Sequence, residues 1–164
     1  MQTENDPVTA HRKYLGVAIE EAMEGMRSDE GGPFGAVVVR DGRIIGRGHN
    51  SVLKHHDPTA HAEINAIRDA CRNIGNHHLT GAVIYTNFEP CPMCLAAIYW
   101  ADMRRLYYAA GRLEAEKIGF MDNRLYGEFS LPLEERELKL TRIPVPEMSR
   151  LLDEWNGKKG KIFY

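Results

Sequence analysis

The chain has 164 residues, of which 43% are hydrophobic and 27% are charged, so one compact domain with a single core is expected over residues 1–164. Its net charge of −2 and pI of about 6.4 exclude a global positive field that would attract nucleic acids. The three cysteines fit a reducing compartment, and residues 1–7 lack the features of a secretory leader. The sequence also has no apolar run long enough to cross a membrane, so we expect a cytoplasmic protein without a membrane partner.

The first elements in the chain are expected to form scaffold. Apolar residues recur at helical spacing from His11 to Met26, which predicts an amphipathic helix. A glycine-rich break at 31–35 follows, and the apolar, β-branched run 36–39 predicts a buried strand. Asp41-Gly42 separates this run from Ile44-Ile45, which predicts a tight hairpin between two antiparallel strands.

A second helix is expected after the hairpin. The second strand runs toward His49-Asn50 and leads into a polar connection in which Thr59 is suited to cap a helix that begins near His61. The apolar residues of this helix share one face, and Gly75 is a suitable C-terminal stop. They are Ile64, Ile67, Cys71 and Ile74.

Strands and helices alternate through the rest of the chain. The expected strands are 82–85 and 105–110, and the expected helices are 92–100, 113–119 and 147–155. The pattern weakens after Leu125, where 138–145 fits either a strand or an extended arm. An initial hairpin followed by alternation predicts an α/β fold, a three-layer α/β/α sandwich around a mixed sheet.

The sequence Glu-Pro-Cys-Pro-Met-Cys at 89–94 carries a Cys-x-x-Cys pair. Such a pair can hold zinc, but it also fits a thioredoxin-like redox motif or half of a zinc ribbon. His61-Ala62-Glu63 lies upstream at a helix start. One imidazole and two thiolates match a catalytic zinc site that keeps its fourth position for water, and Cys71 belongs to the core face instead. Glu63 is suited to move a proton of that water.

His-x-Glu followed by Pro-Cys-x-x-Cys resembles the cytidine deaminase-like family of zinc nucleobase deaminases. The resemblance covers most of the chain from His11 to Gly119. It implies a central sheet of about five strands and hydrolytic deamination. It also implies that Zn²⁺ is the cofactor, with His61, Cys91 and Cys94 as ligands and Glu63 as the catalytic proton carrier.

Further segments resemble bacterial guanine deaminases. They are 31–37, 57–63, 89–94 with 97–100, and 118–120 with Asp122. This resemblance implies a small purine substrate, guanine, that is converted to xanthine and ammonia, with Asp122 as a second proton carrier. It also implies a homodimer in which residues 146–164 form a tail exchanged between subunits, so that Tyr164 closes the neighbouring active site.

Four other residues are candidates for contacts with the base. The Asn50 amide can donate and accept at once, Phe34 can stack on a flat base, and the backbone N–H of Ala62 can donate to a purine oxygen. Trp100 is expected to be part core and part pocket wall. Two of them have structural alternatives, a turn residue for Asn50 and a core side chain for Phe34.

Two features depart from the guanine deaminase pattern. Thr86-Asn87-Phe88 stands where small residues are more usual, which is expected to reshape the pocket floor, and 134–155 matches weakly. Guanosine, cytosine and aminotriazine deaminases remain alternatives that differ in pocket detail. A tRNA adenosine deaminase would present a basic, aromatic-rich face, whereas clustered cations here are few. A zinc-stabilised binding module would not need Glu63.

Overall fold

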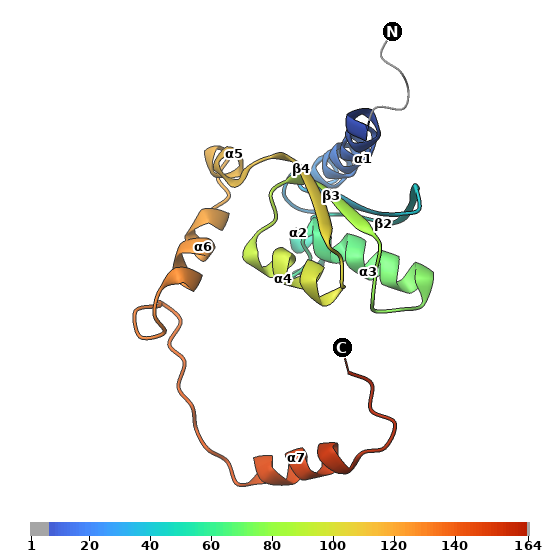
Figure 1. The fold of residues 1–164 in the computed structure, drawn as a ribbon. Helices are drawn as coiled ribbons and strands as arrows, with labels where there is room; N and C mark the ends of the chain where they lie inside the picture. Colours follow the sequence, from blue (N-terminus) through green and yellow to red (C-terminus); the bar gives the residue numbers. More distant parts are fainter. Residues whose placement is uncertain (1–6, 164) are drawn as a thin grey trace. The chain divides into compact units, whose positions relative to one another are not determined.

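The computed structural model describes residues 7–163, which separate into two units at Gly127 and Glu128. The first unit holds the sheet and the helices that pack on it (Figure 1). No helix within residues 7–163 combines the length and hydrophobicity that a membrane crossing requires.

The sheet of the first unit has four strands in the order β2-β1-β3-β4. Their bounds are β1 Gly35–Arg40, β2 Arg43–His49, β3 Val83–Phe88 and β4 Arg105–Ala110. Strand β1 is antiparallel to both β2 and β3, whereas β3 and β4 are parallel. The mixed sheet is confirmed, but the described chain has four strands rather than about five, and 138–145 forms no strand.

Strand β1 runs through the centre of the core and alternates between its two faces. Ala36 and Val38 pack in the cluster formed with α3 and α4, whereas Val37 and Val39 pack against α1. The hairpin to β2 turns at Asp41 and Gly42, which both have positive φ, at 52° and 71°. This is the conformation of a type I′ turn, and it explains the Asp-Gly signal in the sequence.

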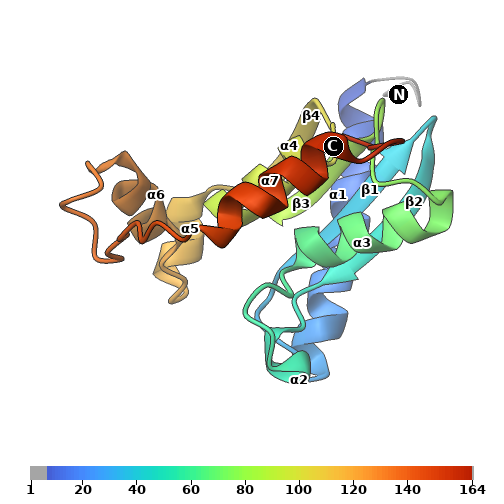
Figure 2. The same ribbon diagram turned by 90° about the horizontal axis from the view of Figure 1, so that it is seen from below.

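Helices cover both faces of the sheet (Figures 1 and 2). Helix α1 (Pro7–Arg27) lies on one face, and α3 (Ala62–Ile74) and α4 (Pro92–Trp100) lie on the other. Gly46 on β2 allows the α3 backbone to approach, since a Cβ atom there would lie 2.4 Å from a carbonyl oxygen of α3. The three-layer α/β/α sandwich is therefore confirmed.

The remaining helices are short. Helix α2 (Val52–His55) follows β2, and α5 (Arg112–Lys117) and α6 (Asp122–Ser130) follow β4. The second unit contains α7 (Glu147–Gly157) and extended chain before it, with large apolar side chains that stay exposed. Leu138 is 75% exposed and Ile143 is 77% exposed within the described chain.

Candidate active site

Two of the three expected metal ligands occupy the residue just before a helix. His61 is the N-cap of α3 and Cys91 is the N-cap of α4, and both have extended backbone conformations. Pro92 fixes the first helical position of α4, and Cys94 follows within the first turn. The positive ends of both helix dipoles therefore lie at the site, where they favour thiolates.

The connection before α3 differs from the expected one. Thr59 does not cap α3, because His61 takes that position. Instead, the Thr59 hydroxyl and the Thr59 N–H both donate to Asp57 Oδ1, at 2.7 and 2.8 Å. This local turn directs the chain so that His61 arrives at the start of α3.

The ligand atoms of His61, Cys91 and Cys94 lie within 4.8 Å of one another. The distances from His61 Nδ1 are 3.6 Å to Cys91 Sγ and 3.5 Å to Cys94 Sγ. A tetrahedral zinc with ordinary Zn–S and Zn–N bonds separates such atoms by about 3.6 Å. Both nitrogen–sulfur separations therefore match those of a zinc site.

The electrostatics of the two thiols also fit a cation. The hydrogen bond from Cys94 lowers the pKa of Cys91 to about 4, and the same contact raises the pKa of Cys94. The hydrogen bond with Cys91 raises the pKa of His61. Two adjacent sulfurs thus share one proton, and a divalent cation is the partner that lets both ionise.

Glu63 lies in the first turn of α3 beside these ligands and is only 7% exposed. Burial raises its pKa to about 7. Near neutral pH this carboxyl group is therefore present both with and without its proton, which suits a group that takes a proton and passes it on.

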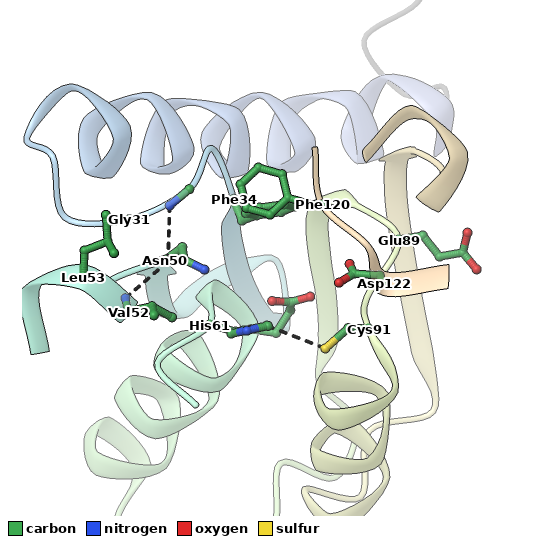
Figure 3. A pocket seen from close by; sticks show the side chains of 12 residues that line it. Gly31, Phe34, Asn50, Val52, Leu53, His61, Glu89, Cys91, Phe120 and Asp122 are labelled. Atoms are coloured by element: carbon green, nitrogen blue, oxygen red, sulfur yellow. Dashed lines mark hydrogen bonds between the residues drawn. The ribbon is translucent and has the colours of Figure 1, made fainter. Parts of the chain in front are cut away.

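The site opens into a cavity of about 400 Å³, a size typical of sites for small ligands (Figure 3). Its lining residues come from five stretches of the first unit: Gly31, Gly32, Phe34, Asn50, Val52, Leu53, His61, Glu63, Glu89, Cys91, Phe120 and Asp122. Burial and the nearby Cys91 raise the pKa of Asp122. The structure therefore brings Asp122 and Glu63 to one pocket from distant parts of the sequence.

Asn50 is held in one orientation by backbone groups. Its Oδ1 accepts hydrogen bonds from the N–H of Gly32 at 3.3 Å and of Val52 at 3.2 Å (Figure 3). The carbonyl oxygen is thus occupied, and the amide Nδ2 is the group available to a ligand. The expectation that Asn50 donates and accepts at once is corrected, because only the donor is left for the base.

Aromatic rings form one wall of the pocket. The Phe34 ring meets Phe120 edge to face at 4.6 Å between centroids, and Phe88 packs against Phe34 at 5.3 Å. Phe34 is half-buried and lines the cavity, so it is not simply a core residue. Phe120 was missed as a single candidate, although it lies in one of the segments that carry the resemblance.

The other candidates lie in different places. Ala62 is buried, and in the sequence it stands between His61 and Glu63, which both line the cavity. It is the first residue of α3, where N–H groups lack intrahelical partners. Trp100 does not line the pocket and is 67% exposed. It ends α4, roughly 13 Å along the helix from Cys91, so the pocket-wall expectation is wrong for this chain. Tyr164 lies outside the described residues.

Glu89 was also missed, although it directly precedes the Pro-Cys motif. It lines the cavity, but its carboxylate points away from His61 and Cys91 (Figure 3). Its Oε2 accepts the Arg112 N–H at 3.2 Å, and its Oε1 lies 3.6 Å from Arg112 Nε. Glu89 therefore anchors the start of α5 rather than the reacting centre.

Comparisons with known proteins agree with this site. The chain is 43% identical to guanine deaminase of Bacillus subtilis over 154 residues, 94% of this chain and 99% of that protein. The crystal structure of guanine deaminase from Bacillus subtilis superposes with a TM-score of 0.89, covering 94% of this chain and 98% of that one.

Two further relatives are more distant or match less of the chain. A structure of guanine deaminase from Nitrosomonas europaea has 33% identity and a TM-score of 0.63, covering 66% of this chain and 63% of that one. The tRNA-specific adenosine deaminase of Agrobacterium fabrum is 48% identical over 97 residues, 59% of this chain and 63% of that protein.

A family model describing the cytidine and deoxycytidylate deaminase zinc-binding region matches residues 8–110. That range includes all three metal ligands and Glu63. The chain belongs to the cytidine and deoxycytidylate deaminase zinc-binding family.

Proposed function

We propose that this protein is a zinc-dependent guanine deaminase that hydrolyses guanine to xanthine and ammonia. The observation that carries the chemistry is Glu63, buried beside the zinc-binding trio at a cavity of about 400 Å³. The choice of guanine is supported by the similarity to guanine deaminase over nearly the whole chain.

Zinc bound by His61, Cys91 and Cys94 would polarise a water molecule and lower its pKa toward ~7. Glu63 takes a proton from the attacking water and delivers it to the ring nitrogen beside C2 of guanine. Its burial suits both steps, because a fully solvated, strongly acidic carboxylate would not hold the proton long enough to pass it on.

The base is held by an aromatic wall and a few polar groups. The Phe34 and Phe120 rings are perpendicular, so one of them faces the base while the other presents its edge, and Asn50 Nδ2 donates a hydrogen bond to an acceptor on the edge of the base. The backbone N–H of Ala62, at the start of α3, donates to the purine oxygen. A pocket with two donors and an aromatic wall favours an oxygen-bearing planar base.

Asp122 is the second proton carrier in this proposal. It is half-buried at the first residue of α6 and lines the same cavity as Glu63. Burial keeps its pKa above the ordinary value, so it holds a proton more readily than a surface aspartate. Asp122 is therefore suited to protonate the departing amine near N1.

We infer that the protein works as a homodimer. Each subunit forms one deaminase domain of 164 residues, and residues 146–164 are exchanged between the two subunits. Apolar side chains support this inference: Tyr99 and Trp100 on α4 are 68% and 67% exposed. Ile143 in the second unit is 77% exposed. A second copy would cover such surfaces, and Tyr164 of that copy would close the pocket.

The function is tested by measuring ammonia release from guanine, guanosine, cytosine, adenine, adenosine and a triazine amine with zinc-loaded protein. We expect turnover of guanine, with the others at least about a hundredfold slower, because Asn50 and the cavity wall are matched to one base. Activity confined to cytosine or adenine would contradict the substrate while leaving the zinc chemistry standing.

A tRNA adenosine deaminase is the second candidate. The identity of 48% to such an enzyme over 97 residues favours it, but another tRNA-specific adenosine deaminase that matches 88% of the chain is 34% identical, below the 43% identity to guanine deaminase. Deamination of an adenosine in an RNA stem-loop, without turnover of free guanine, would replace our assignment with this one.

A further inference from the structure

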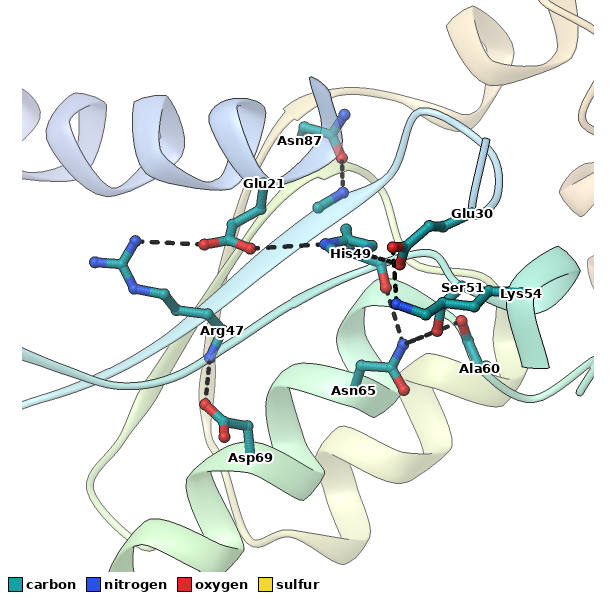
Figure 4. Close-up of polar contacts among 11 residues, drawn as sticks. Glu21, Glu30, Arg47, His49, Ser51, Lys54, Ala60, Asn65, Asp69 and Asn87 are labelled. Atoms are coloured by element: carbon teal, nitrogen blue, oxygen red, sulfur yellow. Dashed lines mark hydrogen bonds and ion pairs between the residues drawn. The ribbon is translucent and has the colours of Figure 1, made fainter. Parts of the chain in front are cut away.

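The end of strand β3 makes an unusual contact with the glycine-rich turn before β1. Asn87 Oδ1 accepts a hydrogen bond from the N–H of Gly35 at 2.9 Å (Figure 4). Its Nδ2 donates to the carbonyl oxygen of Pro33 at 2.8 Å. Only a side-chain amide offers a donor and an acceptor in this arrangement, so the residue type matters.

This contact extends the sheet beyond its last backbone pair. The ladder between β1 and β3 starts at Ala36 opposite Thr86, and the turn lies beyond it. Asn87 holds the turn on both sides of Phe34, through Pro33 and Gly35. Gly35 also lies against α1, where a Cβ atom would come within 2.0 Å of the Ala18 carbonyl oxygen.

The turn joins both side chains that we assign to the base. The Phe34 ring lines the cavity, and the Phe34 carbonyl oxygen accepts the N–H of Asn50 at 2.9 Å. Gly32 in the same turn donates to Asn50 Oδ1. A shift of the turn would therefore move the aromatic wall and the amide donor together.

Phe88, the residue after Asn87, supports the same ring. Its centroid lies 5.3 Å from that of Phe34, and Phe88 does not line the cavity. The Thr86 hydroxyl donates to the Phe88 carbonyl oxygen at 2.6 Å and so fixes the end of the strand. The segment 86–88 thus acts on the pocket through Phe34 rather than as its floor.

We propose that Asn87 is a positioning residue for base recognition, which sets the place of Phe34 and Asn50 by holding the turn at 31–35 against β3. The identity of the base rests on the proposed function, but the positioning does not. Within residues 7–163 the hydrogen bonds of Asn87 go to Gly35 and Pro33 and not to the zinc ligands or Glu63, so its loss acts on binding rather than on the reacting centre.

The kinetic test compares Asn87→Ala and Asn87→Asp with wild type. The aspartate keeps the acceptor and the shape but loses the donor to Pro33. We expect the KM for guanine to rise about tenfold, as for loss of a part-buried hydrogen bond, with kcat within about threefold. Zinc content should stay at one per chain, which separates this effect from collapse of the site.

Asn73→Asp is the matched control. Asn73 lies on α3, does not line the cavity, and its Nδ2 donates to the Ile45 carbonyl oxygen at 2.9 Å. We expect unchanged kinetics. A KM in Asn87→Ala that matches wild type, or a fall in kcat with KM unchanged, would overturn the proposal.

Amide hydrogen exchange gives a readout that needs no substrate. The Gly35 and Asn50 N–H groups should exchange about tenfold faster or more in Asn87→Ala, and at the wild-type rate in Asn73→Asp. Unchanged exchange would overturn the positioning. If wild-type protein released no ammonia from guanine, the proposed function would fail while the exchange result would still decide this inference.

Discussion

At the scale of single residues, Glu63 combines burial with a position two residues after a metal ligand. Glu63→Gln keeps the shape of the side chain but removes its ability to carry a proton. We expect deamination to fall by about 10²–10⁴-fold, with one zinc per chain retained. Steady-state ammonia release and metal analysis check this result, and a variant that keeps full activity would exclude Glu63 as the proton carrier.

The raised pKa of Glu63 also predicts a pH dependence of folding in the metal-free protein. Because burial raises the folded-state pKa from 4.5 to about 7, the folded form binds more protons than the unfolded form between these values. The contribution of Glu63 to stability should therefore fall as pH rises through this window, by an amount on the order of 3 kcal/mol. Cys91 and His61 also titrate in the metal-free protein, so the measurement is the difference in unfolding free energy between chelated wild type and chelated Glu63→Gln, which should fall across this window.

The sequence identified the metal ligands and Glu63 because these residues lie in two short motifs at helix starts. It could not show that backbone amides occupy the Asn50 carbonyl, since those amides belong to separate loops. It also placed Trp100 wrongly, because an apolar helix does not reveal which end faces the cavity.

At the scale of elements, the start of α3 is tied to the end of β2 by Asn65. Its Nδ2 lies 2.9 Å from the His49 carbonyl oxygen, 2.9 Å from Ser51 Oγ and 3.2 Å from the Ala60 carbonyl oxygen (Figure 4). Two of the acceptors belong to His49 and Ser51, which flank Asn50 in the sequence. The third belongs to Ala60, which directly precedes His61. Asn65 therefore links the end of β2 and Asn50 to the helix that starts at the metal ligand His61.

Asn65→Ala should lower the free energy of unfolding by about 1–3 kcal/mol, since buried acceptors lose their donor. It should also weaken zinc binding, because the segment before His61 loosens. Denaturant titration and competition with a zinc chelator measure the two effects, with Asn73→Ala as the control on the same helix. Unchanged stability and zinc affinity would show that the link is dispensable.

The strands and helices of the first unit were largely predictable from periodicity. Residues 92–100 and 105–110 match α4 and β4 at both ends. The N-cap of α3 was not predictable in this way. The Thr59 hydroxyl donates to the Asp57 carboxylate instead of capping the helix, and His61 is the N-cap residue. Competition among nearby polar side chains decided that position.

At the scale of the whole molecule, the second unit leaves apolar side chains exposed. Periodicity predicted α7, but 138–145 has no strand pairing within the described residues, so sequence pattern alone did not define this region.

Burial of the exposed apolar side chains in a homodimer would stabilise the dimer by ~25 cal/mol per Å² of apolar surface removed from water. Sedimentation at micromolar concentration should therefore give twice the 18.6 kDa chain mass, and a persistent monomer would contradict the exchange of residues 146–164.

Removal of Phe163 and Tyr164 tests the role assigned to the C-terminus. We expect kcat for guanine to drop by about tenfold or more, because an open pocket admits water that closure would exclude. The circular dichroism spectrum and melting temperature should remain close to those of wild type. Unchanged kinetics would remove the C-terminal residues from the active site.

The central claim is that one zinc, held by His61, Cys91 and Cys94, is needed for guanine turnover. The most direct measurement follows xanthine formation while zinc is removed with a chelator and then restored in steps. We predict that the rate tracks bound zinc and reaches its maximum at one ion per chain. Full activity in zinc-free protein, or no xanthine at full zinc occupancy, would contradict the account.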